Sequence, residues 1–436
     1  MDPLILGLLG IAGMFVLIAL HVPIGVAMGL AGFICVGLML GWGPAVALFG
    51  IEPSGIVSHT DLAVIPLFLL MGSFAGAAGL SADLYRLAYA LVGHLRGGLA
   101  MSTIGGCAGF GAVCGSSVAT CATMTRVALP EMLRRNYQPA MATGCIAAGG
   151  TLGMLIPPSV IMVLYAVLTE QFVIALFVAA IIPGLVAVLL HFIAIFIYVR
   201  VNPEAGPAGP KMPWPERLRV FRDSWAVVSL GVVVSGGIYT GIFTVAEAAA
   251  VGAIMSFGFA IMRGKLSWRV LWRVLSESAA NTGLIYLIII GAHIFSYFVA
   301  LSDMAEQLVS VIQSLGVHPL VVMFLLHLVY LILGSIFDTV AAMVITLPFV
   351  FPLIIALGFD PIWFGVINIM VIEIGMITPP IGLNVFVLHG IARTIPLGTI
   401  FRGIVPFLVA DLVRLSILTF FPVIALWLPG LMGMLE

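Results

Sequence analysis

Two short polar segments interrupt otherwise apolar stretches of the chain. The first reads GSSVAT at 115–120 and the second reads GSIFDT at 334–339. Backbone released from helical hydrogen bonds inside a bilayer is tolerated only where it is buried in protein or lines a cavity. Because hard cations prefer oxygen ligands, the hydroxyls, the carboxylate and the free carbonyls at these breaks predict sodium sites.

A doubled proline forms the second kind of break. It occurs in GGTLGMLIPPS at 149–159 and in EIGMITPPIGLN at 373–384. Proline lacks the backbone N–H and clashes with the preceding turn, so each pair must interrupt a helix. We therefore expect two broken spans that face two hairpin tips, with an ion site in each half and a substrate site between them. Simple packing kinks are the alternative.

The predicted site residues share an oxygen-bearing side chain or a position beside one of these breaks. The expected sodium-binding residues are Gly115, Ser116, Ser117, Thr151, Gly153, Gly334, Asp338, Thr339, Gly375 and Thr378. The expected lining of the substrate site is Ser116, Pro157, Pro158, Ser335, Pro379, Pro380 and Asn384. The sequence carries no catalytic cluster, no Walker lysine motif and no motif for another metal, so we expect neither an enzyme nor a cofactor other than coupling sodium.

The isolated ionisable residues of the apolar runs are expected to differ in role. Asp338 lies at a predicted hairpin tip, and carboxylates inside a membrane are costly and usually functional. Asp411 and Arg414 are three positions apart, a spacing that predicts a structural ion pair across one helical turn.

The composition identifies the setting of these residues. Of the 436 residues, 62% are hydrophobic and only 8% are charged, and the mean hydropathy is +1.26. A soluble domain carries about 25% charged residues. The chain is therefore expected to be an all-α polytopic membrane protein, which excludes a soluble enzyme and a nucleic-acid-binding protein.

About ten apolar runs are long enough to cross the hydrocarbon core. They lie at about 4–20, 23–41, 64–80, 139–168, 172–199, 224–243, 245–262, 278–300, 361–391 and 403–428. Two more apolar pieces, at about 99–133 and 319–357, each contain a polar break and are predicted to be re-entrant hairpins.

The charges give these spans an orientation. Every basic loop falls on one side of the predicted map, within 86–135, 200–222, 263–273 and 393–402. By the positive-inside rule this side is cytoplasmic, so both termini are expected in the periplasm. The opposite side carries no Lys or Arg, and its acids are Glu52, Asp61, Glu170, Asp303, Glu306 and Asp360.

A proline-rich segment at 202–223 is expected to be an extended cytoplasmic linker between two halves, 1–201 and 224–436. Because each half has an odd number of spans, the second must be inverted relative to the first. The prolines at 130, 139, 157 and 158 recur 222 positions later, which supports an internal repeat. The hairpin breaks align instead at an offset of 219, which pairs Gly115 with Gly334.

Four segments together resemble the large membrane subunit of tripartite ATP-independent periplasmic (TRAP) transporters. They are GGTLGMLIPPS, EIGMITPPIGLN, TDLAVIPLFLLMG at 60–72 and GIFTVAEAAAVGA at 241–253. The resemblance extends over essentially the whole chain. One departure is that the family usually shows Pro-Thr-Glu where this chain has Val245, Ala246 and Glu247.

The resemblance implies a mechanism and partners. Such subunits act with a small four-span membrane subunit and a periplasmic binding protein, and they import an organic acid across the bacterial inner membrane on the sodium gradient. It also implies an elevator movement, with the hairpins and broken spans in a transport domain and the other helices in a scaffold. A sodium/dicarboxylate transporter without a binding protein is the alternative; a channel or a non-transporting scaffold is a third possibility.

Overall fold

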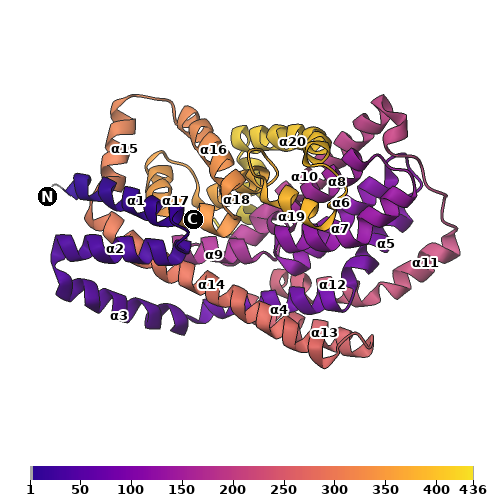
Figure 1. The fold of residues 1–436 in the computed structure, drawn as a ribbon, viewed down its shortest axis with the longest axis horizontal. Coiled ribbons are helices and arrows are strands. Elements are labelled where there is room, and N and C mark those ends of the chain that lie inside the picture. The colour runs from indigo at the N-terminus through magenta and orange to yellow at the C-terminus, as the bar shows by residue number, and fades with distance from the viewer. Residues whose placement is uncertain (1–2, 436) are drawn as a thin grey trace.

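The computed structural model describes residues 3–435, and all regular structure in this part is helical (Figure 1). The helices up to the linker are α1 (Pro3–Ala19), α2 (Ile24–Leu40), α3 (Trp42–Ser58), η1 (Thr60–Ala63), α4 (Val64–Ala77), α5 (Leu80–Val92), α6 (Gly98–Cys114), α7 (Ser117–Arg134), α8 (Pro139–Leu155), α9 (Val160–Thr169) and α10 (Val173–Val201). The later helices are η2 (Pro203–Ala205), α11 (Trp214–Asp223), α12 (Trp225–Tyr239), α13 (Val245–Met262), α14 (Trp268–Leu301), α15 (Met304–Ser314), α16 (Pro319–Ile336), α17 (Thr339–Ala356), α18 (Pro361–Gly375), α19 (Leu383–Ile391), α20 (Leu397–Phe420) and α21 (Val423–Leu431).

Many of these helices can cross a membrane. Seven are long and apolar enough to do so, and the pair α8 and α9, bent by 43° at its break, adds an eighth. All of the expected spans lie in helices. Four of these helices, α1, α2, α12 and α18, are only 15 to 17 residues long. The chain is a multi-pass membrane protein, although its spans are less uniform than their hydropathy predicts.

Glycine allows the central helices to pack closely. Gly25 of α2 and Gly291 of α14 face each other, and a Cβ atom added to Gly291 would overlap the Gly25 carbonyl oxygen. Gly144 of α8 and Gly403 of α20 make an equivalent backbone contact. Since lipid supplies no hydrophobic drive between helices, such close van der Waals contacts hold membrane helices together. Figure 1 shows α14 as one long helix that crosses the molecule beneath α2.

The hairpin helices and broken spans of the second half occur in the same order along the chain as those of the first half. Helices α6 and α16 end 222 positions apart, at Cys114 and Ile336, and α7 and α17 begin 222 positions apart. The offset of 219 used for the hairpin breaks is therefore wrong. Helix α16 continues through Gly334 and Ser335 and ends at Ile336, and Asp338 caps the start of α17. The second break therefore lies at 337–338.

The linker differs from the extended segment that its prolines predict. Its second part forms α11, which has no buried residue. Its first part is held against the preceding half, because Gly97 N donates to Gly206 O at 2.9 Å and Gly209 N donates to Gly93 O at 3.2 Å. At the span expected at 278–300, α14 begins at Trp268, ten positions before the apolar run, so its first turns carry polar residues.

Glu247, which follows the two residues that depart from the family pattern, has a structural role. Thr244 and Glu247 form a reciprocal cap at the start of α13, in which Thr244 N donates to Glu247 Oε2 at 2.8 Å. The Glu247 carboxylate therefore satisfies a free N–H at a helix end.

Candidate functional site

Each hairpin turns at a short break whose first polar residue caps the returning helix. In the first hairpin, Gly115 has a φ of +63°, and Ser116 Oγ accepts from Ala119 N at 3.3 Å. In the second hairpin, Asp338 Oδ1 accepts from Ala341 N at 3.3 Å. Ser116 and Asp338 therefore occupy equivalent places at the starts of α7 and α17.

The proline pairs lie at the breaks of the two discontinuous helices. The pair Pro157 and Pro158 lies between α8 and α9, and the pair Pro379 and Pro380 lies between α18 and α19. Both proline–proline peptide bonds are cis. In the second loop, Gly382 N donates to Ser335 O at 3.1 Å, which attaches the loop to the end of α16.

These prolines leave the same two carbonyls without a helical partner in each half. A helix carbonyl accepts from the N–H four positions later, and proline has none. The carbonyls of Gly153 and Met154 therefore lack their usual donor in the first half, and those of Gly375 and Met376 lack it in the second. In the second half both carbonyls have other donors: Gly375 O accepts from Thr378 N at 2.8 Å, and Met376 O accepts from Asn384 N at 3.1 Å.

A cavity of about 530 Å³ joins the two hairpin tips. Gly115, Ser116 and Ser117 line it from the first tip, and Asp338 and Thr339 line it from the second. The structure thus brings together five of the predicted ion-site residues. Its other walls come from α2, α4, α14 and the breaks, and include Gly25, Leu69, Asn281, Leu287, Met154 and Met376.

Several predicted site residues lie near this cavity but do not line it. Gly153 packs against Gly111, and Gly375 packs against Gly334, so these glycines serve contacts between a hairpin helix and a broken span. The hydroxyls of the remaining ion-site threonines and of Ser335 are bonded to backbone carbonyls three or four positions earlier in the chain. Thr151 donates to Ala148 O, Thr378 donates to Ile374 O, and Ser335 donates to Ile332 O.

The prolines and Asn384 also lie off the cavity. None of the four prolines lines it, and Pro158 instead faces a separate pocket beside α12. Asn384 is fully buried behind the tips, where Cys121 Sγ lies 3.5 Å from its backbone oxygen. Its side-chain oxygen and nitrogen have no hydrogen-bond partner among the described residues.

The two tips meet through one methionine, Met376, that lines the cavity. Ser117 Oγ donates to Met376 Sδ at 3.4 Å, and Thr339 Oγ1 lies 3.0 Å from the same sulfur. Thr339 Oγ1 also donates to Glu373 Oε1 at 2.5 Å. A hydroxyl from each half therefore reaches the same point on the second broken span.

The predicted site residues do not include the cavity residues Met154, Met376 and Asn281 or the adjoining Glu373. Met154 and Met376 carry a signal, because they recur at the offset of 222. Glu373 opens the second Pro-Pro segment, but its position in the span gives no indication that it meets Thr339. Asn281 has only its polarity within an apolar helix as a signal.

The expected ion pair in α20 is confirmed. Arg414 Nη2 lies 3.0 Å from Asp411 Oδ1, and both side chains are buried. His191 of α10 joins them, with Nε2 3.0 Å from the same Asp411 oxygen. This cluster ties α10 to α20, which fits a structural role.

The cavity between the tips has one charged lining residue. Asp338 is acidic, and no Lys or Arg is among the described residues that line the cavity. The N-termini of α7 and α17 lie at the same cavity, and a helix N-terminus presents free N–H groups and a partial positive charge. The site therefore offers carboxylate, hydroxyl and backbone groups but no basic side chain.

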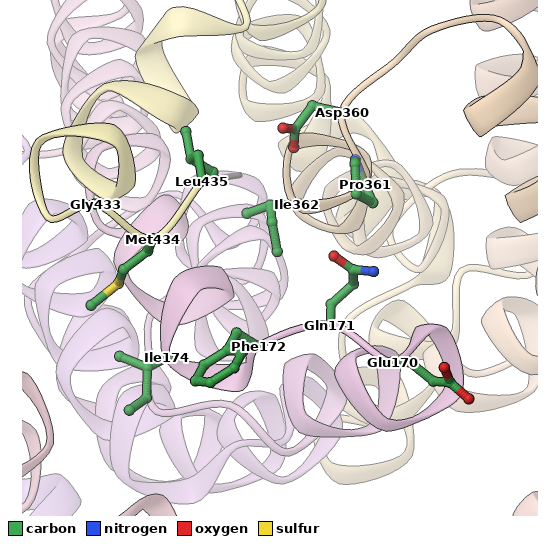
Figure 2. Close-up of a pocket in the computed structure, with 10 residues that line it drawn as sticks. All are labelled: Glu170, Gln171, Phe172, Ile174, Asp360, Pro361, Ile362, Gly433, Met434 and Leu435. Carbon is green, nitrogen blue, oxygen red and sulfur yellow. The ribbon is translucent and has the colours of Figure 1, made fainter.

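A second hollow of about 480 Å³ is formed by the loop between α9 and α10, the loop between α17 and α18, and the C-terminal turn (Figure 2). Glu170 and Asp360 are its acids, and the described residues that line it include no base. Neither hairpin tip reaches it. It therefore belongs to the acidic end of the molecule and not to the site between the tips.

An all-helical multi-pass membrane protein with paired hairpins and broken helices has the architecture of a secondary transporter. A sequence model of the family described as "Tripartite ATP-independent periplasmic transporter, DctM component" matches residues 11–424. The chain belongs to this family, and its relatives are transporter permeases and not enzymes.

Known proteins agree with this assignment. The chain is 38% identical to the C4-dicarboxylate TRAP transporter large permease protein DctM of Pseudomonas aeruginosa, over 86% of this chain and 88% of that protein. It is 30% identical to the isethionate TRAP transporter permease protein DctMQ of Oleidesulfovibrio alaskensis, over 98% of this chain and 67% of that protein. Its fold is similar to the YdaH transporter of Alcanivorax borkumensis, with a TM-score of 0.64, 16% identity and coverage of 91% and 90% of the two chains.

Proposed function

We propose that this protein imports a small organic anion, a carboxylate, across the bacterial inner membrane together with sodium ions. One observation carries the proposal: the cavity between the hairpin tips has an acid and no base on its described walls. An anion entering such a site in a low-dielectric medium needs a neutralising charge. Bound sodium ions supply it, which makes anion uptake depend on the sodium gradient.

The two hairpin tips supply the groups for both ligands. Ser117, Thr339 and Asp338 offer oxygen ligands to sodium, and the Met154 carbonyl, freed by the first proline pair, adds a backbone oxygen at the cavity wall. The N-termini of α7 and α17 suit the carboxylate groups of the anion. Each half contributes one tip and one broken span, so we assign one sodium site to each half and place the substrate between them.

The matching order of helices supports an inverted repeat with an elevator movement. We assign the hairpins α6–α7 and α16–α17 and the broken spans α8–α9 and α18–α19 to the transport domain. The long helix α14 and α2 face the tips across the cavity and belong to the scaffold. Because Gly25 and Gly291 lock α2 to α14, this side suits a fixed frame.

Two partners follow from membership in the family. We propose that a small four-span membrane subunit docks on the scaffold and that a periplasmic binding protein delivers the anion. The isethionate relative is named DctMQ and has about a third of its length outside the match, in accord with a fused small subunit. Trp268 and Trp272, both exposed on the first turns of α14, suit the interface region of a bilayer or a docked helix.

Reconstitution tests this function. Purified protein in liposomes, with its small subunit and a candidate binding protein, should take up labelled carboxylates when sodium is higher outside and should not do so with potassium in its place. Uptake without the binding protein would instead indicate a self-sufficient transporter. Ion flux that neither saturates nor requires substrate would indicate a channel.

A further inference from the structure

A small cavity at the basic end of the molecule has two arginines on its walls. It has a volume of about 330 Å³ and lies between the turn before α6 and the last turns of α10. The described residues that line it are Leu95, Arg96, Met101, Phe196, Val199 and Arg200. The cavity therefore combines apolar walls with two positive charges, and no acid is among these residues.

Both arginines are available to an anion. Arg96 and Arg200 are exposed, and the Arg200 guanidinium lies over the Phe196 ring at 5.4 Å from its centre. Such a cation–π contact holds the group in place and leaves its N–H donors free. The arginines that form ion pairs within residues 3–435 are different ones, namely Arg134, Arg135, Arg222, Arg263 and Arg414.

The turn that carries Arg96 is fixed against α10. Gly97 has a φ of +74°, and a Cβ atom there would lie 2.7 Å from Ile195 Cγ2, so glycine allows this close approach. The linker also holds the turn, through the bond from Gly97 N to Gly206 O. Backbone contacts therefore fix the relative position of the two segments that supply the arginines.

The length of α10 places the cavity at the membrane surface. The helix has 29 residues. At about 1.5 Å per residue it extends over about 43 Å, which exceeds the hydrocarbon thickness of about 30 Å. It begins just after Glu170 at the acidic end, and Arg200 is in its last turn. A site on its last turns therefore lies at the depth of the lipid head groups on the basic side.

An exposed apolar stripe on α10 leads to this cavity. Its residues recur every four positions and therefore share one face of the helix. They are Leu185, Leu189, Ile193 and Ile197. Phe196 and Arg200, which line the cavity, are three and seven positions beyond Ile193 and continue the same face. An exposed apolar face of this kind on a membrane-spanning helix suits contact with acyl chains.

We propose that this cavity binds the head group of an anionic phospholipid whose acyl chains lie along the exposed face of α10. The guanidinium groups of Arg96 and Arg200 donate to the phosphate oxygens, a pairing that the planar guanidinium favours. Basic pockets at the cytoplasmic ends of membrane helices bind anionic head groups in this way. The inference depends on the location of the chain in a membrane and not on its transport activity.

The charges of the cavity also give the site a preference among lipids. A zwitterionic head group carries an ammonium group beside its phosphate, and no carboxylate among the described lining residues would pair with it. The two arginines repel that group. The site therefore prefers a head group with a net negative charge, such as that of phosphatidylglycerol.

Native mass spectrometry of the full chain in detergent measures this binding. Phosphatidylglycerol should bind more tightly than phosphatidylethanolamine. From the contribution of one basic side chain near a membrane surface, Arg96→Gln and Arg200→Gln should each weaken phosphatidylglycerol binding about fivefold, and the double variant about twenty-five-fold. The matched control is Arg269→Gln, because Arg269 is also exposed at the basic end, on α14, but does not line the cavity. Its binding should equal that of the unaltered protein.

Thermal unfolding separates loss of binding from loss of folding. Without lipid, the double variant and Arg269→Gln should unfold at the same midpoint as the unaltered protein, because the altered side chains are exposed. A ligand that binds only the folded state stabilises it. Added phosphatidylglycerol should therefore raise the midpoint of the unaltered protein and of Arg269→Gln more than that of the double variant.

Four results would overturn the proposal. The first two are equal binding of the two lipids and equal phosphatidylglycerol binding by the double variant and Arg269→Gln. The third is an equal rise in the unfolding midpoint with inorganic phosphate at the same concentration, because the site would then bind free phosphate and not lipid. The fourth is loss of bound phosphatidylglycerol when the small membrane subunit is added, which would make this face of α10 a protein interface.

Discussion

At the scale of single residues, hydroxyl and carboxylate oxygens from two distant parts of the chain meet at one cavity. Ser117 and Asp338 are 221 positions apart, yet both line the space between the tips. At its wall, Thr339 and Ser117 converge on Met376. This convergence joins the two halves at the residues to which we assign sodium binding.

Removing one of these oxygens should weaken sodium binding. Ser117→Ala and Asp338→Asn each take away one ligand, and a hydrogen-bond-like contact to a charged group contributes about 1.5–3 kcal/mol. We therefore expect the sodium concentration for half-maximal uptake to rise about tenfold to a hundredfold. The measurement is uptake against sodium concentration in liposomes.

The matched control is Ser54→Ala, because the Ser54 hydroxyl is exposed and bonds only to Ile51 O in its own helix. Its sodium dependence should match that of the unaltered protein. If Ser117→Ala and Asp338→Asn also leave the sodium dependence unchanged, neither side chain is a sodium ligand.

At the scale of helices, close backbone contacts and breaks within helices have different structural roles. The contact between α2 and α14 depends on glycine, since a Cβ atom at Gly291 would overlap the backbone of Gly25. A Cβ atom added to Gly283, two turns earlier in α14, would meet no other atom within 4 Å. This pair of glycines separates the effect of packing from the effect of helix propensity.

Gly291→Ala should destabilise the protein and Gly283→Ala should not. Forcing extra atoms into a well-packed contact costs about 1–3 kcal/mol. At the exposed position, alanine favours the helix over glycine by about 1 kcal/mol. Thermal unfolding in detergent, followed by tryptophan fluorescence, should therefore give a lower midpoint for Gly291→Ala only, and equal midpoints would refute the close contact.

The proline pairs test whether the broken helices build the site. Replacing Pro157 and Pro158, or Pro379 and Pro380, by alanine restores the N–H groups that the carbonyls four positions earlier lack. Those carbonyls would return to helical bonds, so uptake should fall severely in both double variants and the sodium requirement should change. Uptake in liposomes, after a check of folding by size-exclusion chromatography, measures this.

If the prolines only bend packed helices, either double variant should transport normally. That outcome in folded, inserted protein would end the assignment of one sodium site to each half.

At the scale of the whole molecule, the charges divide between two ends. Basic residues gather where the linker packs on the first half, as at Arg135, which lies over the Tyr89 ring and bonds to Glu131. The opposite end has the hollow with Glu170 and Asp360 (Figure 2). This division supports a linker in the cytoplasm and acidic loops in the periplasm.

Cysteine labelling tests that orientation. Cysteines introduced at Lys211, on the linker, and at Glu170, on the acidic loop, are both at exposed positions. A membrane-impermeant thiol reagent added to intact cells should label the second once the outer membrane is permeabilised, and should label the first only after the inner membrane is opened. The five native cysteines are buried, so their background should be low.

Labelling of both positions from the periplasmic side would contradict the topology. It would also remove the argument for an inverted second half, because that argument depends on the linker being cytoplasmic.

The sequence alone determined the class of protein and the segments in which its helices break. Continuous apolar runs can bury their backbone polar groups in a bilayer only as helices, and proline pairs interrupt helices wherever they occur. These are local properties, so composition and spacing predicted the helical membrane fold, both hairpins, both broken spans and the ion pair of Asp411 with Arg414.

The tertiary structure decided which of the predicted residues share a site. The hydroxyls of Thr151 and Thr378 bond to nearby backbone carbonyls, and Gly153 and Gly375 pack against other glycines. By contrast, Ser117 and Thr339 reach Met376. The register of the second hairpin likewise depends on Asp338 as a helix cap. The direction in which a side chain points depends on how helices pack across hundreds of positions, and hydropathy and spacing carry no information about that packing.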